Sequence, residues 1–198
     1  MGQTRLSRSL AERPQERPDA AVAFRVAQRA FLAGDRLEMQ DLAAEIGVSR
    51  ATLFRWVGPK EQLLVEIFWS LAVPTFEQAV TSAGGTRGPQ RIAKVLSAIA
   101  GASVRSAPFM AFVQREPKQA LRLLCTRAGT FQDRLLGLIE PLLQEEIEAG
   151  RVSPPLPLHD LAYLILRVTE TFVYADAIAG ATPDPAKVGQ AIRALLRD

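Results

Sequence analysis

Helical periodicity runs through almost the whole chain and constrains its fold more than any other feature. Apolar residues recur at spacings of three and four, as on one face of an α-helix, and no stretch alternates β-branched residues between hairpin-type turns. Glycine and proline interrupt the pattern at intervals and divide it into about nine expected helices. The sequence therefore predicts an all-α protein.

The breakers set the expected helix boundaries. Helices are expected at 19–34, 38–46, 50–57, 60–80, 91–105, 109–114, 117–149, 159–179 and 184–197. Asp19 is a good N-cap for the first helix, and Gly47 is a good C-terminal residue for the second. Pro74 and Pro141 fall inside two expected helices and should bend them. The clearest linker is 81–89, which is rich in glycine and small polar residues.

Composition narrows the class of protein. With 198 residues, 48% hydrophobic and 23% charged, the chain can bury a core as one domain, or as a small module fused to a larger one. Cys125 is the only cysteine and His159 the only histidine, so one chain can form neither an internal disulfide nor a zinc site of four N/S ligands. We expect no metal site and no cofactor.

The same composition bears on localisation. No apolar stretch follows the polar N-terminus, and no run of about 18 apolar residues occurs, so neither a signal peptide nor a membrane span is expected. The expected location is the cytoplasm.

The net positive charge of the chain lies in its N-terminal part. Residues 1–60 hold ten Lys and Arg against seven Asp and Glu, which accounts for the whole formal charge of +3. A basic module on a neutral body suggests that one end faces a polyanion. Residues 1–18 carry four arginines, and we expect this tail to be disordered when unbound.

Residues 37–63 form the most informative segment. Two short helices joined by a glycine-containing turn are the pattern of a helix-turn-helix, in which the second helix reaches base edges. Ala43 is small where the helices cross, Gly47 permits a left-handed turn residue, Val48 packs between the helices, and Ser49 caps the second helix. The alternative is an αα-hairpin with a chance glycine turn.

This segment resembles the DNA-binding module of TetR-family transcriptional regulators. The match is carried by Ala43, Gly47, Val48, Ser49, Thr52, Leu53, Phe54, Trp56, Val57, Lys60 and Leu63. The resemblance implies a three-helix DNA-binding domain over 19–65, preceded by the 1–18 tail. It also implies a helical domain for ligand binding and dimerisation over 66–198, where the likeness lies only in length and helix count.

The resemblance also implies DNA contacts. The residues that correspond to base contacts are Gln40, Arg50, Ala51 and Thr52; those that correspond to phosphate contacts are Phe54, Arg55, Trp56 and Lys60. A bidentate Arg–guanine or Gln–adenine pair contributes about 1–3 kcal/mol of discrimination. The tail before Asp19 is a further candidate for minor-groove contact.

Three departures from the family pattern concern the phosphate contacts. Phe54 replaces a tyrosine and lacks its hydroxyl, for which Arg55 is a candidate replacement. Glu38 and Met39 stand where the second helix is expected to begin with a threonine. Pro59 replaces a serine before Lys60, so we expect capping there to fall to Gly58.

The C-terminal part has features of a dimer interface. The helix expected over 159–179 is apolar on more than one face, so it must be buried from several sides. One chain could bury it, but a symmetric four-helix interface formed with the last helix explains it better. We therefore expect a homodimer.

Aromatic residues near helix breaks suggest a mainly apolar ligand pocket. The candidates are Phe68, Trp69, Phe76, Phe109, Met110, Phe112, Phe131 and Tyr163, each of which could also be ordinary core. Arg167, Glu170, Thr171 and Tyr174 share one stripe of an apolar helix. An Arg167–Glu170 pair there is either a surface or dimer-seam ion pair, or a polar anchor in which Glu170 meets a ligand head group.

The function expected is that of a ligand-responsive repressor. It would bind a near-palindromic operator as a dimer and be released by a small apolar or amphipathic effector, for example an acyl-chain compound. The alternative is a helical ligand-binding or interaction protein whose DNA-binding module has degraded. No nucleophile, base or phosphate-loop motif indicates an enzyme.

Overall fold

The computed structural model describes residues 18–126, 130–154 and 156–196. Within these ranges every regular element is an α-helix, so the all-α prediction is confirmed. The helices are α2 (Ala20–Leu32), α3 (Met39–Glu45), α4 (Arg50–Val57), α5 (Lys60–Ser82), α6 (Gly88–Arg105), α7 (Ala107–Arg115), α8 (Pro117–Cys125), α9 (Phe131–Glu148), α10 (Leu158–Val173), α11 (Ala175–Ala179) and α12 (Pro185–Leu195). The expectation for the N-terminal tail lies outside the described residues except at Pro18.

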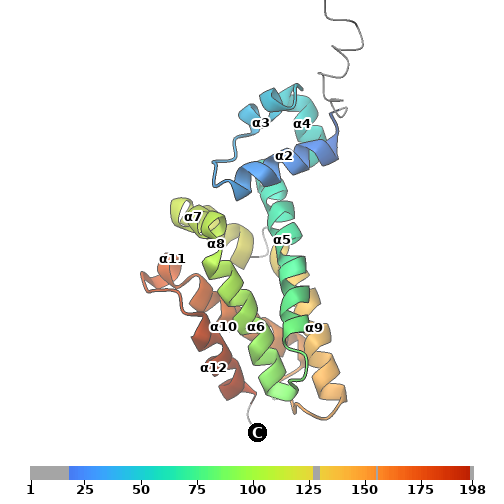
Figure 1. Ribbon diagram of the computed structural model, residues 1–198, viewed down its shortest axis with the longest axis vertical. Helices are drawn as coiled ribbons and strands as arrows, with labels where there is room; N and C mark the ends of the chain where they lie inside the picture. The colour runs from blue at the N-terminus through green and yellow to red at the C-terminus, as the bar shows by residue number, and fades with distance from the viewer. Residues whose placement is uncertain (1–17, 127–129, 155, 197–198) are drawn as a thin grey trace, which may run out of the picture.

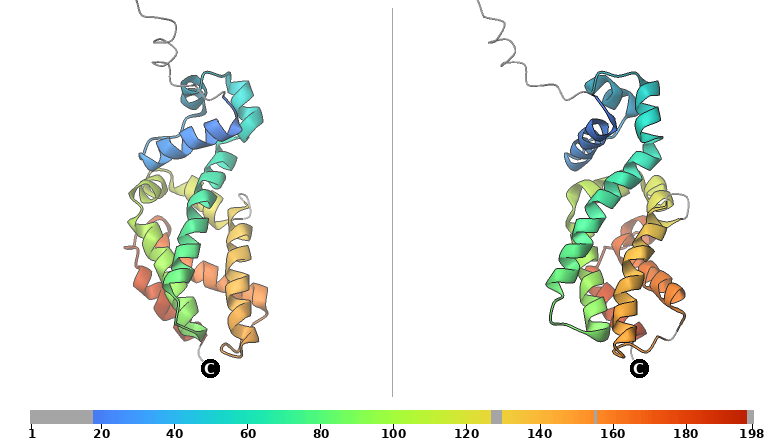
Figure 2. Two further views of the ribbon diagram at one scale, coloured as in Figure 1. Left: turned by 45° about the vertical axis from the view of Figure 1, so that its right-hand side comes forward. Right: turned by 90° about the vertical axis from the view of Figure 1, so that its right-hand side faces the viewer.

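The helices form an N-terminal helix-turn-helix and a larger helical body, joined by one long helix. Helices α2, α3 and α4 gather at one end of the molecule, here called the helix-turn-helix unit (Figure 1). Helix α5 starts in this unit and runs down the body formed by α6 to α12, as the turned views also show (Figure 2). At 23 residues and about 1.5 Å per residue, α5 is long enough to connect the two parts directly.

Local capping explains where several helices begin. The Asp19 carboxylate accepts a hydrogen bond from Val22 N at 2.7 Å. In the same way Asp184 accepts one from Ala186 N at 3.1 Å. Each bond satisfies a backbone donor that the first turn leaves unpaired, and the predicted starts of α2 and α12 are thereby confirmed.

The helix-turn-helix unit is held by a small apolar core. Ala23 and Ala27 on α2 are fully buried and allow close packing of the helices, and Leu53 of α4 is fully buried as well. Burying a leucine contributes about 1.5–3 kcal/mol, so Leu53 fixes the orientation of α4 in the unit.

Helix α5 is both the connector and a core helix. Among the described residues it is the only single helix long and apolar enough to pass for a membrane span, with a mean hydropathy of 1.3. Its Leu63, Leu64, Ile67 and Phe68 are buried in the core that it shares with other helices. Pro74 lies inside α5 without ending it.

The described helices number eleven rather than about nine because two of the expected long ones are each divided into two. The chain leaves helical geometry at Thr126, and Thr130 has a left-handed φ of 53°, so the expected 117–149 helix becomes α8 and α9. The Cys125 carbonyl at the end of α8 accepts a hydrogen bond from Arg167 Nη1 at 2.8 Å. Tyr174 ends α10, and α11 follows it.

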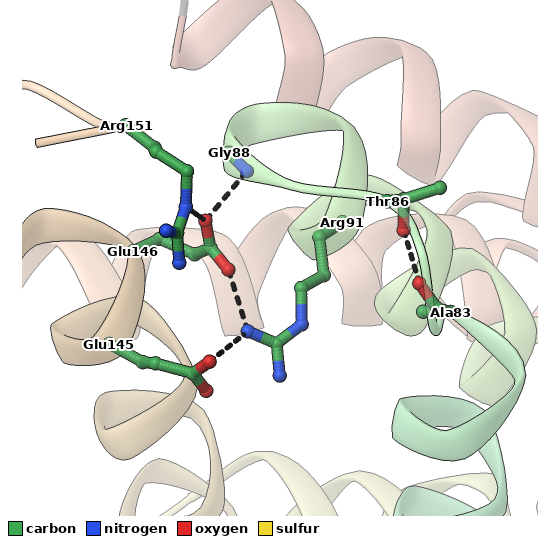
Figure 3. A network of polar contacts seen from close by, with 7 residues as sticks. All are labelled: Ala83, Thr86, Gly88, Arg91, Glu145, Glu146 and Arg151. Atoms are coloured by element: carbon green, nitrogen blue, oxygen red, sulfur yellow. Dashed lines mark hydrogen bonds and ion pairs between the residues drawn. The ribbon is translucent and has the colours of Figure 1, made fainter. Parts of the chain in front are cut away.

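A buried carboxylate ties α6 to α9 at the far end of the body. Glu146 is 0% exposed and accepts hydrogen bonds from Gly88 N at 2.7 Å, Arg91 Nη1 at 2.6 Å and Arg151 Nε at 2.6 Å (Figure 3). Arg91 also pairs with Glu145 at 2.7 Å. We call these residues the Glu146 cluster. The bond to Gly88 explains why α6 begins there, three residues before the expected start.

Candidate functional site: a recognition helix and an apolar cavity

Helix α4 has the local geometry of a recognition helix. Ser49 Oγ accepts a hydrogen bond from Thr52 N at 3.1 Å and lies 2.9 Å from the Thr52 hydroxyl. Gly47 before it has a φ of 72°, which lies in the left-handed region expected of the turn glycine. The predicted cap and turn are therefore confirmed, and the N-terminus of α4 faces outward with a partial positive charge.

Most of the residues expected to contact bases are accessible to solvent. Gln40, Arg50 and Ala51 are exposed, and Thr52 is half-buried because its hydroxyl packs against Ser49. Gln40 comes from α3 and the others from the first turn of α4. Their exposure is compatible with reading a major groove.

The residues expected to contact phosphates are more varied. Phe54 is 57% exposed, although it is a large apolar side chain, and Arg55 beside it is exposed. Trp56 is half-buried and packs against the hydrophobic core, so packing occupies part of its surface. Lys60 Nζ lies 3.6 Å from Glu38 Oε1.

Two of the departures from the family pattern have structural counterparts. Glu38 holds two cations, since its carboxylate lies 2.9 Å from Arg36 Nε as well as near Lys60. The expectation that Gly58 caps α5 is wrong: Gly58 ends α4 with a φ of 70°, and Pro59 occupies the N-cap of α5 without a side-chain hydrogen bond.

The body contains an apolar cavity of about 350 Å³. Its walls come mainly from α5, α6, α7, α9 and α10, and Leu32 at the end of α2 also lines it. This volume lies within the usual range of small-molecule sites, about 300–1,000 Å³. The cavity is therefore the candidate ligand site.

The structure brings some of the predicted pocket residues together and separates others. Phe68, Phe109, Phe131 and Glu170 line the cavity, and so does Phe76. Trp69, Phe112, Met110 and Tyr163 do not line it.

Helix geometry explains the separation. Trp69 packs edge-on against Phe131 at 6.4 Å under the Arg134 guanidinium, one residue round the helix from Phe68. Phe112 is buried with its ring 5.2 Å from that of Phe68 and does not line the cavity. Tyr163 is 44% exposed on α10.

The small polar residues in the cavity lining were not predicted from the sequence. Thr75, Ser103 and Thr169 line the cavity, but each hydroxyl donates to the carbonyl four residues earlier in its own helix. Their donors are therefore already used. Tyr174 also lines the cavity. Its position on the same helical stripe as Glu170 was the sequence feature that could have indicated this.

Glu170 lies at the centre of an incompletely paired polar cluster. It is 6% exposed, and its Oε2 lies 2.6 Å from Arg167 Nη2, which confirms an intrahelical pair but not a surface one. Within the described part of the chain, Glu170 Oε1 and Arg167 Nε and Nη2 are buried without a hydrogen-bond partner. Buried unpaired polar atoms are uncommon in proteins.

Burial controls ionisation in this cluster. Desolvation raises the pKa of Glu170 to about 7, although the Arg167 charge opposes the shift. Desolvation likewise raises the pKa of the Cys125 thiol to about 12 and that of Tyr174 well above its ordinary value. Near neutral pH, both Cys125 and Tyr174 thus remain protonated beside a carboxyl group that titrates.

Side-chain contacts connect the cavity to the helix-turn-helix unit. Phe68, in the cavity wall, packs edge-on against Phe31 of α2 at 5.5 Å. On the surface, Arg115 Nη1 donates to the Gly34 carbonyl at 3.2 Å, and Arg36 Nε lies 3.7 Å from a Glu116 carboxylate oxygen. The end of α2 is therefore shared between the two parts of the molecule.

Comparisons with known proteins agree with this architecture. Residues 87–197 match the family described as "Tetracyclin repressor-like, C-terminal domain". None of the curated protein sequences matches the chain. Among solved structures, the chain is similar to the TetR-family transcriptional repressor QsdR of R. erythropolis, with 26% identity and a TM-score of 0.79 over 90% of this chain and 96% of that one.

Two more distant structures share the fold. The first is the transcriptional regulator FadR from Bacillus subtilis in complex with stearoyl-CoA, with 16% identity and a TM-score of 0.60 over 88% of this chain and 95% of that one. The other is the TetR-family repressor AlkX from Dietzia sp., implicated in biodegradation of n-alkanes. It has 19% identity and a TM-score of 0.56 over 90% of this chain and 92% of that one.

Proposed function

Because this chain belongs to the TetR family of transcriptional regulators, we propose that it is a ligand-responsive repressor. It binds a near-palindromic operator as a homodimer and is released when a small apolar or amphipathic effector fills the cavity. Residues 19–65 are the DNA-binding domain and residues 66–198 the ligand-binding and dimerisation domain. TetR-family regulators are in general non-enzymatic DNA-binding proteins, and we assign this one no catalytic role and a cytoplasmic location.

The DNA-binding part of the proposal is supported by the accessible face of α4. Arg50 is exposed in its first turn and is suited to a bidentate contact with guanine. Lys60, at the first turn of α5, is suited to a phosphate contact. In a dimer the two α4 helices would enter successive major grooves about 34–36 Å apart.

The observation that carries the ligand response is the presence of Leu32 in the cavity wall. Leu32 is the last residue of α2, so a molecule in the cavity touches the helix-turn-helix unit directly. An effector that displaces the end of α2 changes the separation of the two recognition helices. A coupling free energy of about 1–3 kcal/mol between effector and DNA is then enough to release the operator.

The proposed dimer is supported by apolar residues that remain exposed in the single chain. Helix α10 packs against α6, α9 and α12 of its own chain, so one chain covers more of it than its sequence suggested. Tyr163 on α10 and Ile178 on α11 are nevertheless large apolar side chains exposed to solvent. A partner subunit would bury such residues.

Fluorescence anisotropy tests the proposal with DNA from upstream of the chain's own gene and of its neighbours. We expect one fragment to bind about a thousandfold more tightly than random DNA, with affinity that falls as salt rises. The double variant Arg50→Glu, Lys60→Glu should abolish this binding. The matched control is Arg87→Glu, Lys94→Glu, which makes the same change of charge on exposed residues of the body. Operator binding that survives the first double change would disprove the assignment of α4.

The alternative is a ligand-binding protein with a degraded DNA-binding module. The Glu38 carboxylate favours it, because this group lies 3.6 Å from the Lys60 ammonium where a phosphate oxygen would have to bind. Equal and weak binding to every DNA fragment in the salt series would support this alternative over the repressor.

A further inference from the structure

We propose that Glu170 and Tyr174 form a head-group subsite that binds a neutral hydrogen-bond donor, an amide or a hydroxyl, carried on an apolar chain of medium length, and that discriminates against a carboxylate. The inference rests on the proposed function, because it assigns effector chemistry to the same cavity. It concerns residues that neither the fold nor the family match assigns to a ligand.

One carboxylate oxygen of Glu170 is available to a ligand. Glu170 lines the cavity, is 6% exposed, and leaves Oε1 without a hydrogen-bond partner in the described part of the chain. A buried acceptor left unsatisfied costs about 1–3 kcal/mol. A ligand that donates a hydrogen bond to this oxygen recovers that free energy.

The groups around Glu170 determine which ligands fit. Arg167 does not line the cavity, although its Nη2 lies 2.6 Å from Glu170 Oε2 and its Nη1 donates to the Cys125 carbonyl. The Cys125 thiol and the Tyr174 hydroxyl are protonated, because burial raises the pKa of both. A ligand carboxylate would therefore meet a like charge on Glu170, with no free cation beside it in the described lining.

An amide or a hydroxyl suits the same place. Either group can donate to Glu170 Oε1 and accept a hydrogen bond from the Tyr174 hydroxyl. Thr75, Ser103 and Thr169 compete weakly, because their hydroxyls already donate to backbone carbonyls. Ser106 supplies the remaining hydroxyl of the described lining. Polar recognition thus rests mainly on Glu170 and Tyr174 in a mainly apolar cavity.

The cavity volume limits the length of the chain. A cavity of about 150 Å³ holds a benzene molecule of about six heavy atoms, and by that proportion 350 Å³ holds roughly 14. A ten-carbon chain with a small head group fits this limit. Decanamide and decanoate are matched probes, because they have the same number of heavy atoms and differ in the charge of the head group.

Isothermal titration calorimetry on the full-length protein at pH 8 tests the subsite. We expect decanamide to bind about tenfold more tightly than decanoate, because the decanoate charge faces Glu170. In Glu170→Gln this ratio should fall below about threefold, since the new amide nitrogen donates to a carboxylate. Tyr174→Phe should weaken decanamide by about threefold, because the head group loses a donor.

A matched control separates recognition from a general loss of structure. Glu77→Gln makes the same chemical change on an exposed residue of α5. It should leave the ratio unchanged. The comparison of the two ligands on the wild-type protein needs no variant, so it decides even if Glu170→Gln fails to fold.

Three results would overturn the subsite: decanoate binding as tightly as decanamide, an unchanged ratio in Glu170→Gln, or no binding of decanamide. Operator binding by the ligand-free protein is measured in parallel. If the ligand tests fail while operator binding is intact, only the proposed subsite is disproved. If the protein shows no specific DNA binding, the proposed repressor function is disproved. The calorimetry then tests the subsite independently of that function.

Discussion

Two buried glutamates on neighbouring helices have opposite surroundings. Glu146 is 0% exposed and accepts hydrogen bonds from two arginines and a backbone N–H. Desolvation opposes its ionisation, but the bonds from Arg151, Arg91 and Gly88 outweigh it and lower its pKa to about 2. Glu170 is 6% exposed, has one arginine and leaves an oxygen unpaired, and desolvation raises its pKa to about 7.

The difference separates a structural carboxylate from one suited to a ligand. In the Glu146 cluster both oxygens are satisfied by groups of the protein, so the cluster holds α6 and α9 together and has no remaining acceptor to offer. Glu170 lies beside a cavity and keeps an acceptor that the protein does not satisfy. Burial alone does not distinguish the two sites; the completeness of hydrogen bonding does.

The largest expected effect is the loss of the Glu146 charge. Glu146→Gln leaves Arg91 and Arg151 without their counter-ion, and breaking a buried pair from one side costs about 3 kcal/mol. Urea unfolding at fixed protein concentration measures the change in the free energy of unfolding. The control is Glu145→Gln, which removes an exposed partner of the same Arg91 and should cost less than about 0.5 kcal/mol. Equal losses for the two variants would refute the distinction between buried and exposed partners.

A smaller effect is expected from pH. The pKa of Glu170 is raised on folding from 4.5 to about 7, so its favourable contribution is complete below pH 4.5 and is lost as pH rises through 7. Unfolding measured between pH 5 and pH 8 should show a loss of about 2 kcal/mol, which Glu170→Gln abolishes. The Glu146 contribution has the opposite sign, since its depressed pKa gives stability that is lost as pH falls from 4.5 toward 2. The same slope in wild type and Glu170→Gln would show that Glu170 does not titrate in this window.

The smallest effect tests how tightly the Glu146 cluster is packed. Gly88 has a φ of 57°, and a Cβ there would lie 3.0 Å from the Arg151 carbonyl oxygen, whereas Gly180 has a φ of 63° and open space around it. Gly180→Ala should cost about 1 kcal/mol for the left-handed backbone alone. Gly88→Ala should cost about 1 kcal/mol more because of crowding. Thermal unfolding of both variants measures the difference, and equal melting temperatures would mean that the cluster accommodates a methyl group.

The local geometry at the start of α4 was largely predictable from the sequence. The Ser49 cap spans three residues and the Gly47 turn is a property of one, so the residue types alone indicate both. The Lys60–Glu38 pair could not be predicted from the sequence, because it joins two helices whose angle depends on the buried Leu53 and its neighbours.

The cavity was only partly predictable. Phe68 and Trp69 are adjacent and equally aromatic, yet only Phe68 faces the cavity, because successive residues point about 100° apart on a helix. Periodicity finds the apolar face of α5 without indicating which neighbour covers each part of it. The break between α8 and α9 was missed for a related reason: the Arg167 donor that satisfies Cys125 lies 42 residues away in sequence.

The sequence by itself determined the helical fold, most helix starts and the form of the recognition helix, because these depend on backbone preferences and hydrogen bonds within one turn. Tertiary structure decided the roles of the buried charges. Glu146 meets Gly88 across 58 residues and Arg91 across 55, while Glu170 finds a single arginine three residues away. Whether a buried carboxylate is satisfied depends on which distant groups folding brings to it, and that is settled only when the helices pack.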